Sequence, residues 1–170
     1  IEKTASMSWG FVPLTNYQGT DPRAVLEPLS EHLTDYEQLM IQYYGAGVQA
    51  CYRGPRLYDT ETTRQMVART INWYKKYRSI LNADMIQLRR ADGRDWDGLI
   101  HVDPSSKQKA LGMLYNPTKE KITRTIPVPL YYTGLTTSAT LALKDDKATA
   151  KKYTLNRNHE LILTVTIEPE

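Results

Sequence analysis

The 170-residue chain is 41% hydrophobic and 24% charged, the composition of a globular protein with a buried core. Its 22 basic and 19 acidic residues are interspersed and leave a net charge of only +3, so we expect no nucleic-acid partner. No apolar run approaches the length of a membrane span, and the single cysteine excludes an intrachain disulfide.

The first half of the chain alternates strand and helix patterns. Residues 7–14 form an apolar, aromatic run typical of a buried strand, and loop-forming residues follow it. Residues 23–44 then carry apolar side chains at spacings of three and four, which predicts a helix that ends at Gly45 and Gly47. The apolar positions of this helix are Leu26, Leu29, Leu33, Tyr36, Met40 and Tyr43.

A second strand and a second helix repeat this order. Residues 48–51 predict a buried strand, residues 52–56 a loop, and Asp59 or Thr60 a cap for a helix that extends to about Asn82. Strands that alternate with helices at this spacing favour βαβ units with parallel strands. The expected apolar face of the second helix consists of Val67, Thr70, Ile71, Tyr74, Tyr77 and Leu81.

The pattern changes near Asp84 to short strands separated by turns. Asp92-Gly93 between two extended runs predicts a hairpin, because both positions of its two-residue turn need a positive φ. Seven strands are expected, over residues 85–90, 96–102, 109–116, 121–128, 137–143, 150–155 and 161–167. The fold class is therefore α+β: a βαβα domain over residues 1–83 and an antiparallel β-sandwich over residues 84–170.

Several stretches resemble the C-terminal third of large bacterial glycoside hydrolases of the alpha-galactosidase-like type. The stretches that carry this resemblance are MSWGF (7–11), YRGPRLYD (52–59), WYKKYR (73–78), LRRADGRDWD (88–97) and LYYTGL (130–135). Enzymes of that type have a (β/α)8 barrel followed by a C-terminal β-sandwich. The resemblance implies that residues 1–83 are the last units of such a barrel, which needs about 250 residues to close.

The resemblance also implies an activity and partners. It implies hydrolysis of glycosidic bonds, a carbohydrate substrate, and the remainder of the catalytic barrel as a partner. Because the catalytic Asp pair of that family lies on middle barrel strands, no catalytic residue is assigned and the chain alone is expected to be inactive. The chain begins with Ile1, so we expect it to be processed or truncated. A periplasmic or extracellular location and association into a homo-oligomer are further expectations.

Substrate-binding residues are expected where barrel strands end and helices begin. Asn16 and Tyr17 follow the first strand, while Tyr52, Arg53 and Arg56 follow the second. Arginine side chains can bind a carboxylate or sugar hydroxyls, and tyrosine rings can stack on a sugar. The alternative is that the arginines pair with nearby acids and that the tyrosines pack between helix and strand.

Neither a metal nor a cofactor is expected. Asp92, Asp95 and Asp97 could hold calcium, but their spacing does not match a calcium loop, and neighbouring arginines can neutralise them. The three histidines lack partners at metal-ligand spacing, and no glycine-rich phosphate loop is present.

Two other functions stay open on the sequence alone. The chain could be a non-catalytic carbohydrate-binding module, with Tyr131 and Tyr132 near the bound sugar. It could also be a structural accessory domain that braces a barrel or mediates association. Threonines on the outer face of residues 161–167 weakly oppose the binding module, because such a module would favour exposed aromatic side chains there.

Overall fold

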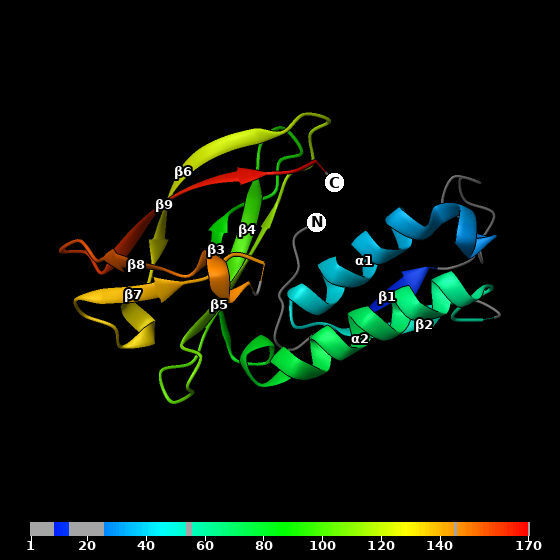
Figure 1. Ribbon diagram of the computed structural model, residues 1–170, viewed down its shortest axis with the longest axis horizontal. Coiled ribbons are helices and arrows are strands. Elements are labelled where there is room, and N and C mark those ends of the chain that lie inside the picture. The colour runs from blue at the N-terminus through cyan, green and yellow to red at the C-terminus, as the bar shows by residue number, and fades with distance from the viewer. Residues whose placement is uncertain (1–8, 14–25, 54–55, 145, 170) are drawn as a thin grey trace. The chain divides into compact units, whose positions relative to one another are not determined.

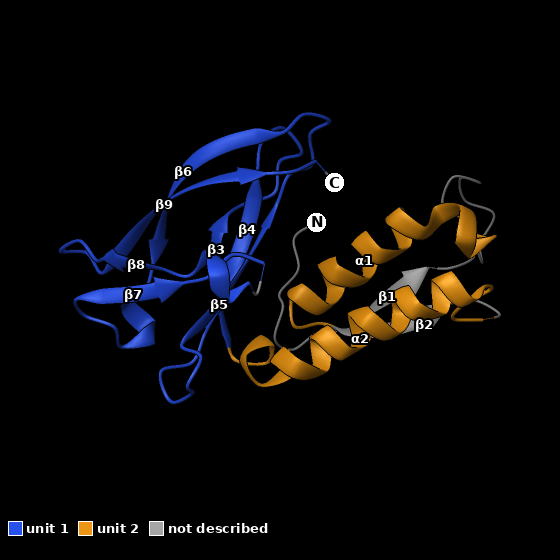
Figure 2. Ribbon diagram, in the orientation of Figure 1, with its two compact units in different colours: residues 1–2, 84–170 blue, residues 3–83 orange. Residues whose placement is uncertain are grey.

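The computed structural model describes residues 9–13, 26–53, 56–144 and 146–169 (Figure 1). The chain divides into two compact units, one within residues 3–83 and the other containing residues 84–170 (Figure 2). The first contains two helices and a parallel strand pair, and the second contains antiparallel strands, so the fold is α+β. None of the described helices is both long and apolar enough to cross a membrane.

The first unit follows the predicted order of strands and helices. Strand β1 (Trp9–Pro13) pairs in parallel with strand β2 (Gln49–Arg53), from Trp9 opposite Gln49 to Pro13 opposite Arg53. Helix α1 (Leu33–Gly45) connects the two strands, and helix α2 (Glu61–Leu81) follows β2. The two helices lie side by side, and α1 also packs against both strands (Figure 1).

Helix α1 begins later than its sequence pattern predicts. Residues 23–25 lie outside the described part of the chain, residues 26–28 are not helical, and a 3-10 helix, η2 (Leu29–His32), precedes α1. Pro28 explains why no helix extends through residues 26–28, because proline lacks the N–H of a helix interior and biases the preceding residue away from helical angles. The prediction of a continuous helix through residues 26–32 is therefore wrong.

The core of the first unit lies between the two helices. Tyr44 of α1 stacks on Tyr74 of α2 with ring centroids 4.6 Å apart. Thr60 caps α2 as predicted, since its side chain accepts a hydrogen bond from the Thr63 N–H. The buried core residues are Leu29, Tyr36, Met40, Tyr44, Met66 and Val67.

The second unit contains the seven predicted strands. They are β3 (Asp84–Arg89), β4 (Asp97–Val102), β5 (Ala110–Tyr115), β6 (Ile122–Pro129), β7 (Ser138–Leu141), β8 (Lys151–Thr154) and β9 (Glu160–Ile167). All pairings are antiparallel: β3, β4 and β5 form one sheet, β6 pairs with β9, and β7 pairs with β8. Two 3-10 turns, η3 (Tyr131–Thr133) and η4 (Lys147–Thr149), complete the unit.

One hydrophobic core joins the three sheets. Alternation along β9 places Leu161 and Leu163 in this core, and both pair with buried residues of β6, Val128 and Ile126. Ile162, between them, is 49% exposed. The every-other-residue burial predicted for this strand is therefore confirmed.

The connection between β3 and β4 is longer than the predicted two-residue turn. Residues 90–96 separate the strands, and the register shifts between Gln87 and Arg89. Gly93 has φ 69°, but Asp92 is not among the described residues with positive φ. The prediction that both turn positions have positive φ is therefore wrong, because a longer loop held by side-chain contacts replaces the tight turn.

Candidate functional site

The parallel pairing of β1 and β2 places their carboxyl ends at one edge of the sheet, where the predicted substrate-binding residues belong. Asn16 and Tyr17 lie outside the described residues. Tyr52 and Arg53 lie within strand β2, opposite Val12 and Pro13, so the prediction that they belong to a loop is wrong. The backbone pairing with β1 extends β2 by two residues beyond its apolar run, which sequence periodicity alone could not reveal.

Arg56 follows β2 and forms an ion pair with Glu27. Its Nη2 donates to Glu27 Oε2 at 2.8 Å and its Nε donates to Oε1 at 3.3 Å. This two-pronged contact raises the pKa of the Arg56 guanidinium. The Arg56 side chain is 51% exposed, and its guanidinium joins the segment after β2 to the segment before α1.

Asp59 ties the same two segments together. Its Oδ2 accepts hydrogen bonds of 2.9 Å from both the N–H and the hydroxyl of Ser30, and its Oδ1 accepts one of 2.8 Å from the Thr63 hydroxyl. Desolvation alone would raise the pKa of Asp59, but these hydrogen bonds outweigh it and lower the pKa from 3.8 to about 2. Asp59 is thus a charged anchor between η2 and the start of α2.

This anchor predicts a stability that depends on pH. Because the pKa of Asp59 is lower in the folded chain, its contribution is complete above about pH 4 and is lost as the pH falls towards 2. Glu61 titrates over the same range, since Arg64 lowers its pKa to about 2. Asp59→Asn should therefore melt at a lower temperature than the wild type at pH 7, and the gap should narrow between pH 4 and pH 2. Thermal melts followed by circular dichroism test this, and a gap independent of pH would contradict it.

Tyr36 provides a buried contact beneath the same loop. Its ring is fully buried, and its hydroxyl donates a hydrogen bond of 3.1 Å to the Leu57 carbonyl. Burial raises the pKa of this hydroxyl, which therefore stays a donor throughout the physiological range.

Removing the Tyr36 hydroxyl should weaken the anchoring of this loop. Tyr36→Phe keeps the ring and leaves the Leu57 carbonyl without this donor, so we expect a loss of about 1 kcal/mol in the free energy of unfolding. Tyr58→Phe is the matched control, because Tyr58 is 48% exposed and should tolerate the change. Urea titration of both variants measures the difference, and equal stabilities would contradict the role of the hydroxyl.

The contacts at this edge thus bring together residues that sequence analysis had not connected. The sequence predicts Arg56 as a site residue and Asp59 as a possible cap, but no pattern in it predicts Glu27 or Ser30 as their partners. Both contacts span 29 residues, so no local spacing signals them. Within the described residues, Arg56 and Asp59 thus connect the segment after β2 to residues 27–30.

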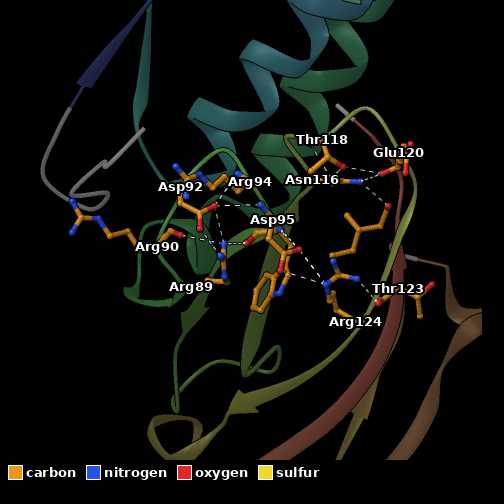
Figure 3. Close-up of polar contacts among 12 residues, drawn as sticks. Arg89, Arg90, Asp92, Arg94, Asp95, Asn116, Thr118, Glu120, Thr123 and Arg124 are labelled. Atoms are coloured by element: carbon orange, nitrogen blue, oxygen red, sulfur yellow. Dashed lines mark hydrogen bonds and ion pairs between the residues drawn. The ribbon is translucent and has the colours of Figure 1, made fainter.

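The acidic side chains between β3 and β4 form hydrogen bonds that hold this connection together (Figure 3). Asp92 accepts a hydrogen bond of 2.6 Å from Arg89 Nη2 and another of 2.9 Å from the Arg94 N–H. Asp95 accepts hydrogen bonds from the Trp96 N–H and from Arg124 Nε on β6, at 2.8 and 3.1 Å. The Arg89 contact lowers the pKa of Asp92, so this carboxylate is negatively charged and the arginine balances its charge.

Two of the three carboxylates considered for calcium are thus paired with different arginines. Burial raises the pKa of Asp97, the third member of the cluster. Within the described residues, no group of three or more histidine, cysteine or acidic side chains could hold a metal ion.

No protein-family model matches this chain, and no curated protein is significantly similar to it.

Proposed function

We propose that the chain is the C-terminal part of a glycoside hydrolase that cleaves glycosidic bonds of carbohydrates. In this proposal, residues 1–83 are the last two units of a (β/α)8 barrel and supply loops to one side of the sugar pocket. Residues 84–170 form a β-sandwich accessory domain. The observation that carries the proposal is the parallel pairing of β1 with β2 across helix α1, followed from Asp84 onward by antiparallel strands.

The unpaired edges of the two-stranded parallel sheet support the proposal that β1 and β2 belong to a larger sheet. Among the described residues, β1 pairs only with β2, and β2 only with β1. Parallel sheets occur almost always in larger sheets covered on both faces, and an unpaired strand edge exposes N–H and C=O groups that favour further pairing. The remaining strands of a catalytic barrel would satisfy both free edges.

The second unit supports the accessory-domain part of the proposal. Three separate antiparallel strand groups contribute to one core, and they are arranged as short strands with turns between them. A β-sandwich accessory domain would likewise fold around a hydrophobic core of its own, which supports this part of the proposal.

The site residues follow from the barrel geometry in this proposal. Barrel enzymes place their catalytic and binding residues at the carboxyl ends of the strands. In this chain β2 ends at Arg53, and Arg56 follows shortly after it. Asn16, Tyr17 and Tyr52 belong to the same proposed substrate-binding set. The catalytic acids would come from barrel strands that residues 1–83 do not include.

An activity assay tests the proposal on the polypeptide encoded by the complete reading frame. We expect this polypeptide to hydrolyse at least one of a panel of 4-nitrophenyl α- and β-glycosides, and the 170-residue chain alone to hydrolyse none. A folded complete polypeptide that cleaves none of these glycosides and no natural oligosaccharide would contradict the proposal.

A matched pair of arginine variants tests the role of Arg56 within that enzyme. Arg56 and Arg64 each form an ion pair with a glutamate, and their side chains are 51% and 52% exposed. If Arg56 binds the sugar, Arg56→Ala raises KM about tenfold, as expected for the loss of one charge-assisted hydrogen bond, while Arg64→Ala does not. An unchanged KM with a lower melting temperature would assign Arg56 to structure only.

A further inference from the structure

Two exposed tyrosines stand together on the second unit, in the turn after β6. The side chains of Tyr131 and Tyr132 are 65% and 63% exposed, more than any other large hydrophobic residue among those described. Their ring centroids lie 5.3 Å apart, and the ring planes are perpendicular, with an interplanar angle of 89°. The pair therefore presents two aromatic surfaces at a right angle to each other.

The residues that flank the tyrosines hold them outward. Leu130 and Thr133, on either side, are 4% and 1% exposed. The Thr133 N–H donates to the Leu130 carbonyl at 3.0 Å, and Gly134 closes the turn with φ 75°, an angle that glycine adopts without strain. Because both flanks are anchored in the protein, the exposure of the rings is built into the fold.

His159 supports Tyr131 from the turn between β8 and β9. Its imidazole meets the Tyr131 ring edge to face, with centroids 5.6 Å apart, and its carbonyl accepts a hydrogen bond of 2.9 Å from the Leu130 N–H. His159 has φ 58°, an uncommon angle for a residue with a side chain. Asn156 fixes this turn, because its Oδ1 accepts hydrogen bonds from the N–H groups of Asn158 and Glu160.

We propose that Tyr131, Tyr132 and His159 form a binding surface for a neutral oligosaccharide, here called the aromatic platform. The electron-rich face of a tyrosine ring attracts the C–H groups on one side of a pyranose ring, and its hydroxyl can hydrogen-bond to sugar hydroxyls. Rings that are already fixed in place lose little conformational freedom when the sugar binds.

The size of the aromatic platform favours a sugar over a protein partner. With about two-thirds of each tyrosine exposed, the two rings offer roughly 200–300 Å² of contact surface. A stable protein interface buries about 800 Å² on each partner. Two rings instead match the footprint of one or two sugar residues.

The proposal concerns residues 84–170 and does not depend on the chain being part of a hydrolase. It is tested by binding, whereas the hydrolase proposal is tested by catalysis, so each can fail alone.

A binding titration followed by NMR tests the aromatic platform. The probes are maltoheptaose, cellohexaose and a galactomannan oligosaccharide, added separately to the ¹⁵N-labelled 170-residue chain. We expect at least one probe to shift the amide signals of residues 130–134 and 156–160 in a saturable way.

Variants separate the aromatic platform from non-specific binding. Tyr131→Ala and Tyr132→Ala should each weaken binding about three- to tenfold, since each removes one aromatic surface. Tyr131→Phe keeps the ring and should bind within about threefold of the wild type, by the same reasoning. Tyr58→Ala is the matched control, because Tyr58 is an exposed tyrosine of the first unit, and it should bind as the wild type does.

Three results would overturn the proposal. One is the absence of saturable shifts at residues 130–134 with every probe. Another is an equal loss of binding in Tyr58→Ala. The last is self-association of the chain that Tyr131→Ala abolishes, because it would assign the aromatic platform to a contact between copies.

Discussion

Replacing Leu161 with alanine should lower the free energy of unfolding of the second unit by about 2–5 kcal/mol. The side chain of Leu161 is 1% exposed and lies in the core shared by the three sheets, so its removal loses apolar burial and leaves a cavity. Replacing its neighbour Ile162 with alanine should lower the same free energy by only about 1 kcal/mol. Ile162 is 49% exposed on the opposite face of β9.

The fluorescence of Trp96 can report the unfolding of this core separately from that of the first unit. It belongs to the core of the second unit, whereas Trp9 and Trp73 belong to the first. Urea unfolding followed by fluorescence, with Trp9 and Trp73 replaced by phenylalanine in every variant, therefore measures the stability of the second unit. Similar losses for Leu161→Ala and Ile162→Ala would contradict the observed register of β9.

Asn116→Ala should lower the free energy of unfolding of the second unit by about 2–3 kcal/mol. Asn116 is fully buried, and its Nδ2 donates to the carbonyls of Glu120 and Ile167 at 2.8 and 3.1 Å. Its Oδ1 accepts from the N–H and the hydroxyl of Thr118 at 3.1 and 2.7 Å (Figure 3). Alanine would remove all four hydrogen bonds, including the buried one that joins the β5–β6 connection to the Ile167 carbonyl at the end of β9.

Asn158→Ala is the control for this substitution. Asn158 is an exposed residue of the β8–β9 turn, so its replacement should change stability by less than about 0.5 kcal/mol. The same Trp96 fluorescence assay measures both variants. A stability of Asn116→Ala within this margin would show that the hydrogen bonds of Asn116 are replaced by water at little cost.

Asn116 also illustrates what a sequence can and cannot reveal. Asn116-Pro117 marks a turn by composition alone, and the turn is present between β5 and β6. That the asparagine is buried and reaches Ile167, 51 residues away, depends on the pairing of β6 with β9. No local pattern specifies a contact between strands so distant along the chain.

The elements themselves were largely predictable, because each has a local cause. Alternating burial defines β9, and Thr60 provides the cap of α2. The late start of α1 was not predicted, because the apolar spacing continues through residues 26–32 while the 3-10 turn η2 precedes α1.

The candidate site was predictable only in part. The rule that chemistry follows strand ends selected Arg56, but its partner Glu27 precedes α1 and becomes a neighbour only in the folded unit. The contact of His159 with Tyr131 likewise joins two turns that are far apart in the sequence. Such residues are found from coordinates, because tertiary packing creates the contact.

The central proposal is that β1 and β2 belong to the parallel sheet of a catalytic barrel. An experimental structure of the polypeptide encoded by the complete reading frame tests this most directly. We predict that a further parallel strand pairs with the free edge of β1 and another with the free edge of β2. Free edges that remain unpaired, or that pair with antiparallel strands, would contradict the barrel and with it the proposed hydrolase.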